Sequence, residues 1–480
     1  MTRGRLFVLW QGLALLFNLA LAAPALADAS SLPDELQSGL QSLKIDLKNV
    51  SLIVKEVNSE RPMVSYQAAI ARNPASVMKM FTTFAALSEL GPGFQWQTDV
   101  RRTGLAENGQ LNGDLIVVGG GDPSFLQENL WALVNQLSVR GIHTINGDLI
   151  VDESLFDLPD HDPGAFDGRQ YRPYNVGPHA ALFNFNAINF TLVPVAKPFV
   201  DIRVVPAVKG LEVVSRVKAL TGACKSNRIR MRIAVEAIES GRQVMFTGQY
   251  PKSCGRYQLT RAVLPSNELL YGTLSTLLEE RGGGLNGALL IGRAPSDSRK
   301  LMSLTSPTLS EVVRSTNKFS NNVMSQQLFL TLGEQMYGAP ATASKGDTAL
   351  RAVLSRQGID VESLIIANGS GLCRQCRVTA DTIVQLLDVA WHSPYMPEFI
   401  ASLGVPGIDG SLKKRFPKGS YKGRVHMKTG TIDHVSAAAG YVQTRDNRRL
   451  QFALMINQEN VHKGAGQAFQ RRLMHYLVAL

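Results

Sequence analysis

Several features that mark common classes of protein are absent from this sequence of 480 residues. Aromatic residues make up only 7% of it, and it has no zinc-finger spacing, no RNA-recognition aromatic motif and no long basic run. Because nucleic-acid-binding proteins depend on such features, we expect no nucleic-acid partner. The eight histidines form no recognisable Ser-His-Asp arrangement, so a catalytic site of that type is not indicated.

Long apolar runs are also scarce, and the one nearest to the length of a membrane span lies close to Met1. It extends from Leu6 to Leu21, contains two polar residues and is short for a bilayer. Basic residues precede it, and Ala25-Leu26-Ala27 follows it as a small-x-small cleavage site. We therefore interpret residues 1–27 as a signal peptide, with a membrane anchor as the alternative. The protein is expected to be exported, in a periplasmic or extracytoplasmic location.

Cysteine is scarce too, with four residues, and an oxidising compartment would pair them. Three connectivities are open for four cysteines. Cys373 and Cys376 are near neighbours, and Cys224 and Cys254 bracket a polar, basic segment, so we predict the bridges 224–254 and 373–376. A redox pair is the alternative for the second bridge, but no thioredoxin-like context surrounds it. No metal site is indicated, because no further Cys or His pair lies nearby.

Acidic residues are fewer than basic ones, and the formal net charge is +11, or +9 without Arg3 and Arg5 of the predicted signal peptide. A basic protein suits an anionic partner, which for an exported protein means cell-wall polymer or a membrane surface. Peripheral membrane association therefore stays open. The alternative is a solvated basic surface with no specific partner.

Three short strings that are present carry the chemistry: Ser76-Val77-Met78-Lys79, Ser320-Asn321-Asn322 and Lys428-Thr429-Gly430. In this order they are typical of a serine enzyme that opens an amide by acyl transfer and uses lysine as its proton carrier. Each string is common by chance, and Ser-x-x-Lys also begins at Ser215, Ser315 and Ser411. Local context favours Ser76, because residues 77–90 have helical spacing that places Lys79 one turn away on the same face.

The spacing of the strings predicts the domain organisation. Between Lys79 and Ser320 lie 240 residues, more than a compact acyl-transfer domain needs. We predict a catalytic domain of residues 28–95 and 298–480, interrupted by an insertion of residues 96–297. Within the insertion, residues 125–141 are expected to be helical and 186–260 β-rich. The phrase Asn-Gly-Asp-Leu-Ile-Val occurs twice, at 112–117 and 146–151, and we interpret each Asn-Gly as a hairpin turn in similar units rather than as part of a solenoid.

The catalytic halves contain both strand and helix patterns. The expected strands lie within 50–67 and 435–457, the latter as a pair around a turn at Asp446-Asn447, and the expected helices lie at 310–333 and 378–391. Residues 465–480 form an amphipathic terminal helix. Packing on a sheet is the favoured use of this helix, and a membrane-surface role is the alternative.

The strings resemble those of low-molecular-mass class C penicillin-binding proteins, the D-alanyl-D-alanine carboxypeptidase/endopeptidase group of serine peptidase family S13. The resemblance covers nearly the whole mature chain and includes the phrases at Gly119–Ser124, Asn368–Arg374 and Gly407–Leu412. It implies an α/β (α+β) fold, in which an antiparallel sheet flanked by helices forms a transpeptidase-like domain interrupted by a large β-rich insertion. It also implies a smaller domain nested at about 122–188.

The resemblance implies peptidoglycan stem peptides as substrates, β-lactam antibiotics as covalent inhibitors, and no cofactor or metal. The chain departs from the family pattern at Asn368, which usually is Asp, at Cys373, which usually is Ser, and at Asn321, which often is Asp. Residues 167–178, where relatives contact the substrate side chain, match poorly and leave Asp167 and Tyr174 as weak candidates.

The implied roles are as follows. Ser76 attacks the carbonyl, Lys79 acts as base with a pKa lowered by burial and Lys428, Ser320 relays a proton and Asn322 orients Lys79 or the substrate. Lys428, Thr429 and Thr431 bind the terminal carboxylate, Gly430 leaves room for substrate, and the backbone N–H groups of Ser76 and Thr431 hold the oxyanion. Arg374 either contacts substrate or forms a structural salt bridge.

Two other functions use the same sequence features. A serine β-lactamase shares the chemistry, but this chain is longer than such enzymes and has no clear omega-loop glutamate. A non-catalytic cell-wall binding protein is the second alternative, against which the intact strings argue. The sequence does not decide between carboxypeptidase and endopeptidase, and it does not indicate an oligomeric state.

Overall fold

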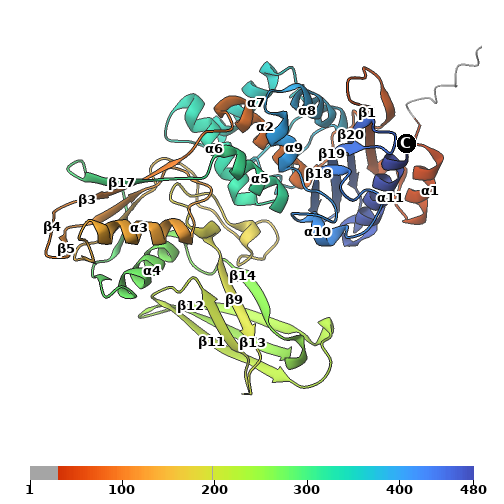
Figure 1. Cartoon of the computed structure of the whole chain (residues 1–480). Helices are drawn as coiled ribbons and strands as arrows, with labels where there is room; N and C mark the ends of the chain where they lie inside the picture. The colour runs from red at the N-terminus through yellow and green to blue at the C-terminus, as the bar shows by residue number, and fades with distance from the viewer. Residues whose placement is uncertain (1–30, 197) are drawn as a thin grey trace, which may run out of the picture.

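The computed structural model describes residues 31–196 and 198–480, so the predicted signal peptide lies outside the described residues. Figure 1 shows two parts of the molecule, one containing both the first strands and the last helix of the chain, the other built from the middle of the sequence. No helix in the described ranges is long and apolar enough to cross a membrane.

The first part is built on a five-stranded antiparallel sheet in the order β18-β19-β20-β1-β2. Its strands are β1 (Val50–Glu56), β2 (Pro62–Tyr66), β18 (Val425–Ile432), β19 (Val435–Gln443) and β20 (Arg449–Asn457). The predicted strand pair around Asp446-Asn447 is confirmed as β19 and β20. β18 is an edge strand of this sheet, and its outer edge pairs only with Gly404 at Met427 among the described residues. The segment η2 (Ala75–Met78) lies against the face of β18 at Gly430.

Helices cover both faces of this sheet. Successive residues of β1 point to opposite sides: Leu52 and Val54 belong to the core with α1 (Asp34–Ser42) and α11 (Ala465–Ala479), whereas Ile53 belongs to the larger helical core. The terminal helix therefore packs on the sheet, as predicted. The helical layer contains α2 (Lys79–Leu90), α5 (Leu309–Phe319), α6 (Asn322–Tyr337), α7 (Ala343–Arg356), α8 (Ala380–His392) and α9 (Met396–Ser402), followed by the short α10 (Leu412–Arg415).

The second part has its own core, which extends from Val100 to Leu304. Its main sheet has the order β16-β8-β6-β3-β17, and a smaller sheet has the order β15-β7-β5-β4. The bounds are β3 (Gln97–Arg102), β4 (Leu105–Glu107), β5 (Gln110–Asn112), β6 (Leu115–Val118), β7 (Thr144–Ile145), β8 (Leu149–Asp152), β15 (Gly284–Leu285), β16 (Leu289–Ile291) and β17 (Arg299–Thr305), with helices α3 (Gln127–Val139) and α4 (Ser266–Glu279). The pairing of β17 with β3 extends this part past residue 297, the predicted end of the insertion.

The Asn-Gly pairs are not hairpin turns, which corrects the sequence interpretation. The strand before each Asn-Gly pair, β5 or β7, belongs to the smaller sheet, and these strands run parallel to each other and to β15. The strand after each pair, β6 or β8, belongs to the main sheet, and these strands run parallel to each other and to β16. At each Asn-Gly pair the chain therefore passes from the smaller sheet to the main sheet. A third copy, Leu285-Asn286-Gly287, extends the series. The side-chain amide of Asn286 donates to Asn146 at 2.9 Å, and that of Asn146 donates to Asn112 at 2.8 Å. Because the copies stack, the arrangement is a short solenoid-like ladder.

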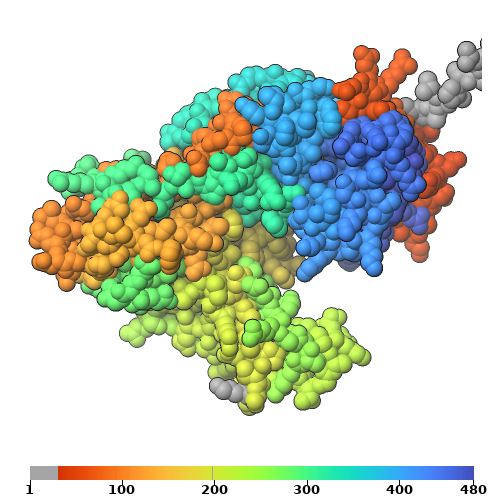
Figure 2. Space-filling view, in the orientation of Figure 1, coloured from red at the N-terminus to blue at the C-terminus, as the bar shows by residue number. Residues whose placement is uncertain are grey.

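A separate β unit lies between β8 and α4. It consists of two three-stranded sheets, ordered β10-β9-β14 and β11-β13-β12. The bounds are β9 (Ile188–Val193), β10 (Asp201–Val205), β11 (Leu211–Leu220), β12 (Arg230–Ile238), β13 (Gly241–Pro251) and β14 (Tyr257–Arg261). The structure thus differs from the expected nested unit at 122–188, because β7 and β8 belong to the sheets of the ladder. Figure 2 shows the β unit projecting from the rest of the molecule.

Candidate active site

Ser76 lies in the 3-10 turn η2, which leads directly into α2, and Lys79 is the first residue of that helix. The one-turn separation predicted from the sequence places Lys79 Nζ 3.1 Å from Ser76 Oγ. Lys79 is completely buried. Its amine also contacts the Asn322 side-chain oxygen at 2.6 Å and the Ser370 carbonyl at 2.5 Å.

The segment Ser320-Asn321-Asn322 separates two helices, where the sequence predicted a single helix over 310–333. Ser320 adopts a left-handed conformation (φ 57°) that ends α5, and the Asn321 side chain accepts a hydrogen bond from Met324 N and begins α6. The break allows Ser320 and Asn322 to reach different lysines. Asn322 Oδ1 accepts from Lys79, and its Nδ2 donates to the Tyr174 carbonyl at 2.8 Å.

Strand β18 brings the third string to the same place. Lys428 is buried, and its Nζ donates to Ser320 Oγ at 2.9 Å and to the Thr429 carbonyl at 2.7 Å. Gly430 explains how closely the strand approaches. A Cβ at this position would lie 2.3 Å from the Pro74 carbonyl and 2.9 Å from Ser76 N, so only glycine allows β18 to lie against the turn that carries Ser76.

Burial lowers the pKa of both lysines. The pKa of Lys79 lies well below its ordinary value, first because the amine is desolvated and second because Lys428 is a nearby cation. The pKa of Lys428 is lowered to about 7, first by burial and second by Arg415. At neutral pH these shifts favour a neutral amine at Lys79.

The structure adds Arg415, which the sequence analysis did not select. Its guanidinium donates to the hydroxyls of Thr429 at 3.3 Å and Thr431 at 3.4 Å. In the described part of the chain, Nε of this side chain has no hydrogen-bond partner. In the sequence Arg415 is the third of three consecutive cations after Leu412, and nothing in that run distinguishes it. Together with Thr429 and Thr431 it forms a group of cation and hydroxyls suited to a carboxylate.

Three residues were considered above as contacts for the substrate, and they lie at the side of the candidate site: Arg374, Asp167 and Tyr174. Arg374 forms an ion pair with Asp433 at 3.5 Å, and its guanidinium lies 4.5 Å from the centre of the Phe166 ring. Burial acts to raise the pKa of Asp167, but hydrogen bonds from Tyr174 and Asn175 outweigh it and lower that pKa. The Asp167 carboxylate therefore holds its own loop together, and Tyr174 reaches Asn322 through its backbone carbonyl.

The four cysteines form two disulfides, Cys224–Cys254 in the β unit and Cys373–Cys376 beside the site. The second closes the loop that carries Arg374. Asn73 donates to the carbonyls of Cys373 and Arg374 at 2.8 and 3.1 Å, which links this loop to the segment before Ser76.

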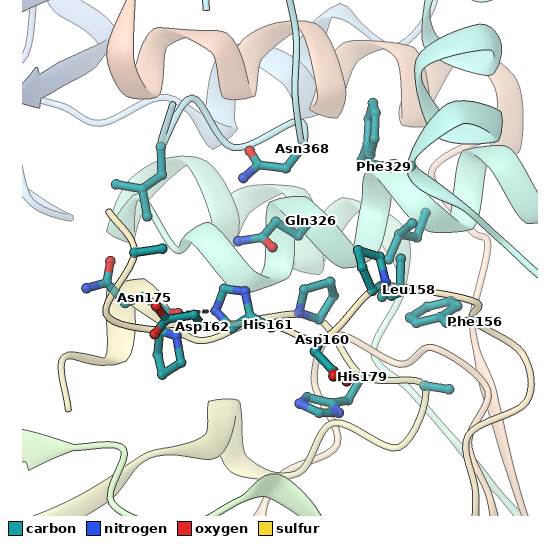
Figure 3. Close-up of a pocket in the computed structure, with 18 of the residues that line it drawn as sticks. Phe156, Leu158, Asp160, His161, Asp162, Asn175, His179, Gln326, Phe329 and Asn368 are labelled. Atoms are coloured by element: carbon teal, nitrogen blue, oxygen red, sulfur yellow. Dashed lines mark hydrogen bonds between the residues drawn. The ribbon is translucent and has the colours of Figure 1, made fainter. Parts of the chain in front are cut away.

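A cavity of about 680 Å³ lies beside α6, between that helix and the segment of residues 153–180. Figure 3 shows Gln326 and Asn368 pointing toward it from one side and His161 and Asp162 from the other. Gln326 lies one helical turn after Asn322. Acids, histidines and apolar side chains line the cavity, and among the described residues no lysine or arginine does.

Comparisons with known proteins agree with this geometry. Residues 32–476 match the D-Ala-D-Ala carboxypeptidase 3 (S13) family. The chain is 30% identical over 459 residues to a D-alanyl-D-alanine carboxypeptidase of Actinomadura sp. (strain R39), covering 91% of this chain and 84% of that protein. The crystal structure of penicillin binding protein 4 (dacB) from Haemophilus influenzae superposes with a TM-score of 0.76 at 26% identity, covering 94% of this chain and 100% of that one. A structure of the same protein complexed with a β-lactam gives a TM-score of 0.72 at 25% identity, covering 93% and 100% of the two chains.

The fold is therefore that of a penicillin-binding serine peptidase, an α/β architecture with a β-rich insertion. The chain belongs to the D-Ala-D-Ala carboxypeptidase 3 (S13) family, as the resemblance in the sequence indicated.

Proposed function

We propose that Ser76 is the nucleophile of an exported enzyme that cleaves the D-alanyl-D-alanine end, or the equivalent cross-link, of peptidoglycan stem peptides. The observation that carries the proposal is the 3.1 Å contact between Ser76 Oγ and the amine of Lys79, whose pKa is strongly lowered. A serine hydroxyl needs a base at neutral pH, and a neutral lysine within hydrogen-bond distance supplies one.

Acylation follows from this geometry. Ser76 Oγ bonds to the carbonyl carbon while its proton passes to Lys79 Nζ. The bond from that carbon to the leaving nitrogen then breaks, and Ser320 gives its proton to the nitrogen while taking one from Lys428, 2.9 Å away. Water later attacks the ester carbonyl, and a proton of this water passes through Ser320 to Lys428. The bond from the carbonyl carbon to Ser76 Oγ breaks as Lys79 returns its proton to that oxygen, which restores the serine and both lysines. The backbone N–H groups of Ser76 and Thr431 are the proposed oxyanion donors, and losing one such donor costs about 3–4 kcal/mol in other serine hydrolases.

Substrate is proposed to lie along the open edge of β18, with its terminal carboxylate at Lys428, Thr429, Thr431 and Arg415. The addition of an extended peptide to an edge strand is a common recognition mode. Asn322 orients Lys79, which it contacts at 2.6 Å. Arg374 is a second-rank candidate for substrate contact, because its charge is already paired with Asp433.

β-Lactams are proposed as covalent inhibitors at Ser76, since the lactam carries an amide and a carboxylate in the same relation as the peptide. The β-lactam complex of the Haemophilus influenzae relative supports this proposal. Export through residues 1–27, and a catalytic domain interrupted by an insertion from about residue 96 to the end of β17, remain part of the same proposal.

Intact-mass analysis after addition of penicillin tests the assignment. We expect the wild-type protein and a Ser315→Ala variant to gain one adduct, and Ser76→Ala to gain none. Ser315 is a matched control because it also begins a Ser-x-x-Lys string but lies on α5. An adduct that persists in Ser76→Ala, or its absence from the wild type, would refute the proposal.

Digestion of purified peptidoglycan distinguishes the two peptidase activities. Release of free D-alanine identifies a carboxypeptidase, and conversion of cross-linked dimers to monomers identifies an endopeptidase. Rapid turnover of penicillin without a stable adduct would instead favour the β-lactamase alternative.

A further inference from the structure

The three-stranded sheet β11-β13-β12 presents a grid of cations on one face. Its register places Arg216 and Arg232 opposite Thr247 of the central strand, and places Lys218 and Arg230 opposite Gln249. Residues in register point to the same side of a sheet, and so do residues two apart on a strand. The four cations therefore lie at the corners of a rectangle of about 7 by 10 Å on one surface.

The opposite face of the sheet is buried, so the cations have to face solvent. Val217, Val244 and Phe246 alternate with the cation rows and belong to the core, where Phe246 packs on Phe190 of the second sheet with ring centres 5.0 Å apart. Arg216, Lys218, Arg230 and Arg232 are all exposed.

The nearest acids on the same face, Glu212 and Glu236, lie in register with Gln243, four residues along their strands from Arg216 and Arg232, and form no ion pair with the grid in the described part of the chain. Residues 213–235 and 240–267 contain ten lysines and arginines and no aspartate or glutamate. Within the ranges the structure describes, only Arg242 of these ten forms an ion pair, with Glu268, and the four grid cations have no side-chain hydrogen bond. The part of the outer face that the grid occupies therefore has a local excess of positive charge.

The end of the sheet beside the grid is covalently held. The Cys224–Cys254 disulfide ties the loop between β11 and β12 to the segment after β13. Lys225, Lys252 and Arg256 lie in the same loops and are exposed. The cations thus extend beyond the grid to loops that the disulfide joins. Figure 1 shows β11, β12 and β13 in a different part of the molecule from the sheet that contains β18.

We propose that this face is a second binding site for peptidoglycan, which holds uncleaved stem peptides by their carboxylates while another stem occupies the active site. The inference rests on the proposed function, in which each unprocessed stem ends in a carboxylate. A grid of several cations matches a polymer with repeated carboxylates, and a second contact raises the effective concentration of the next stem at Ser76. Membrane-surface sites combine cations with large apolar side chains such as Trp, Phe and Leu. The grid rows contain only Arg, Lys, Thr and Gln, and the next row of the same face holds Val214, Met245 and Ala234.

The test measures pelleting of the mature protein with insoluble peptidoglycan sacculi, in a Ser76→Ala background so that the polymer stays intact. One variant carries Arg216→Gln, Lys218→Gln, Arg230→Gln and Arg232→Gln. The matched control carries Lys418→Gln, Lys422→Gln, Lys463→Gln and Arg471→Gln, which are exposed cations of the catalytic part. We expect affinity for sacculi to fall about tenfold in the grid variant only. Binding of the unsubstituted background should also weaken between about 0.01 M and 1 M salt, as the screening length falls from about 30 to 3 Å.

Equal pelleting of the grid variant and its background, or an equal loss in the control, would overturn the proposal. Binding of the grid to vesicles of anionic phospholipid, but not to sacculi, would overturn it in favour of a membrane surface. In parallel, the same two sets of substitutions are made with Ser76 present, and penicillin acylation and cleavage of a short soluble peptide ending in D-alanyl-D-alanine should be unchanged. Failure of these soluble assays in the unsubstituted protein would instead count against the proposed function.

Discussion

The two lysines of the site are buried, and their charge states follow from burial and from a neighbouring cation, which is Lys428 for Lys79 and Arg415 for Lys428. In the proposed mechanism Lys79 starts neutral and Lys428 starts charged. Activity should therefore rise with pH as Lys79 loses its proton and fall as Lys428 loses its own, near pH 7 in the free enzyme. The pH profile of kcat/KM on a soluble peptide measures both limbs.

Arg415→Gln tests the cause of the second limb. Removing this cation should raise the pKa of Lys428, which it lowers, and shift the falling limb to higher pH. KM should also increase, because the guanidinium contacts the hydroxyls of Thr429 and Thr431. Arg415→Lys keeps the charge and serves as the control. An unchanged falling limb in Arg415→Gln would contradict the assignment.

Gly430 sets the distance between β18 and the serine turn. Gly430→Ala would place a methyl group against the Pro74 carbonyl and Ser76 N, and we expect a loss of about 1–3 kcal/mol in unfolding free energy. Acylation by penicillin should fall far more than stability, because Ser76 itself is displaced. Chemical denaturation and acylation rates measure the two effects. Gly292→Ala, where no atom lies within 4 Å of the added carbon, should change neither.

At the scale of elements, the break between α5 and α6 places the neighbouring Asn321 and Asn322 in different roles. Asn321 caps α6 through Met324 N, whereas Asn322 contacts Lys79. We expect Asn321→Ala to cost about 0.5–2 kcal/mol of stability with the acylation rate largely retained. Asn322→Ala should strongly slow acylation.

Thermal unfolding and stopped-flow acylation separate these outcomes. Asn321→Asp should keep the stability of the wild type, because aspartate caps a helix equally well. If Asn321→Ala slowed acylation as much as Asn322→Ala, the division of tasks between the two residues would be wrong.

The Asn-Gly ladder shows why the hairpin turns predicted from a local sequence pattern were wrong. Asn-Gly between short apolar runs is a strong hairpin signal, yet here each pair carries the chain from one sheet to another. At Gly147 a side chain would collide with the Gly113 carbonyl of the preceding copy at 2.5 Å. The glycine is thus required by stacking between copies, and this contact is not visible in any single copy.

On the scale of the whole molecule, the β unit is held to itself by Cys224–Cys254 and lies apart from the catalytic residues. Replacing both cysteines by serine should destabilise this unit by about 3–4 kcal/mol, given the separation of 30 residues. Limited proteolysis should detect earlier cleavage within residues 211–261. Penicillin acylation should be unchanged, and a parallel loss of acylation would show that the unit supports the site.

Two separate hydrophobic cores explain why the middle of the chain forms an insertion. Residues up to Trp96 and from Leu309 onward supply the helical core, while residues between Val100 and Leu304 supply the core of the insertion. The sequence predicted an interruption from the unusual distance between Lys79 and Ser320. The resemblance placed a smaller unit at about 122–188, whereas the separate β unit lies between β8 and α4. Strands of two or three residues such as β7 leave little periodic signal from which such bounds can be predicted.

By itself the sequence determined the chemistry: the serine and lysine one turn apart, the order of the three strings, the terminal amphipathic helix and the pair of strands after Lys428. These features depend on spacing within one turn, strand or helix, and such spacing is visible in the chain. Tertiary structure alone decided that Arg415 faces Thr429 and Thr431, that Tyr174 reaches Asn322 through its carbonyl, and that four cations share one face of the β unit. Those contacts join residues from different strands, helices and loops, and local propensity carries no information about them.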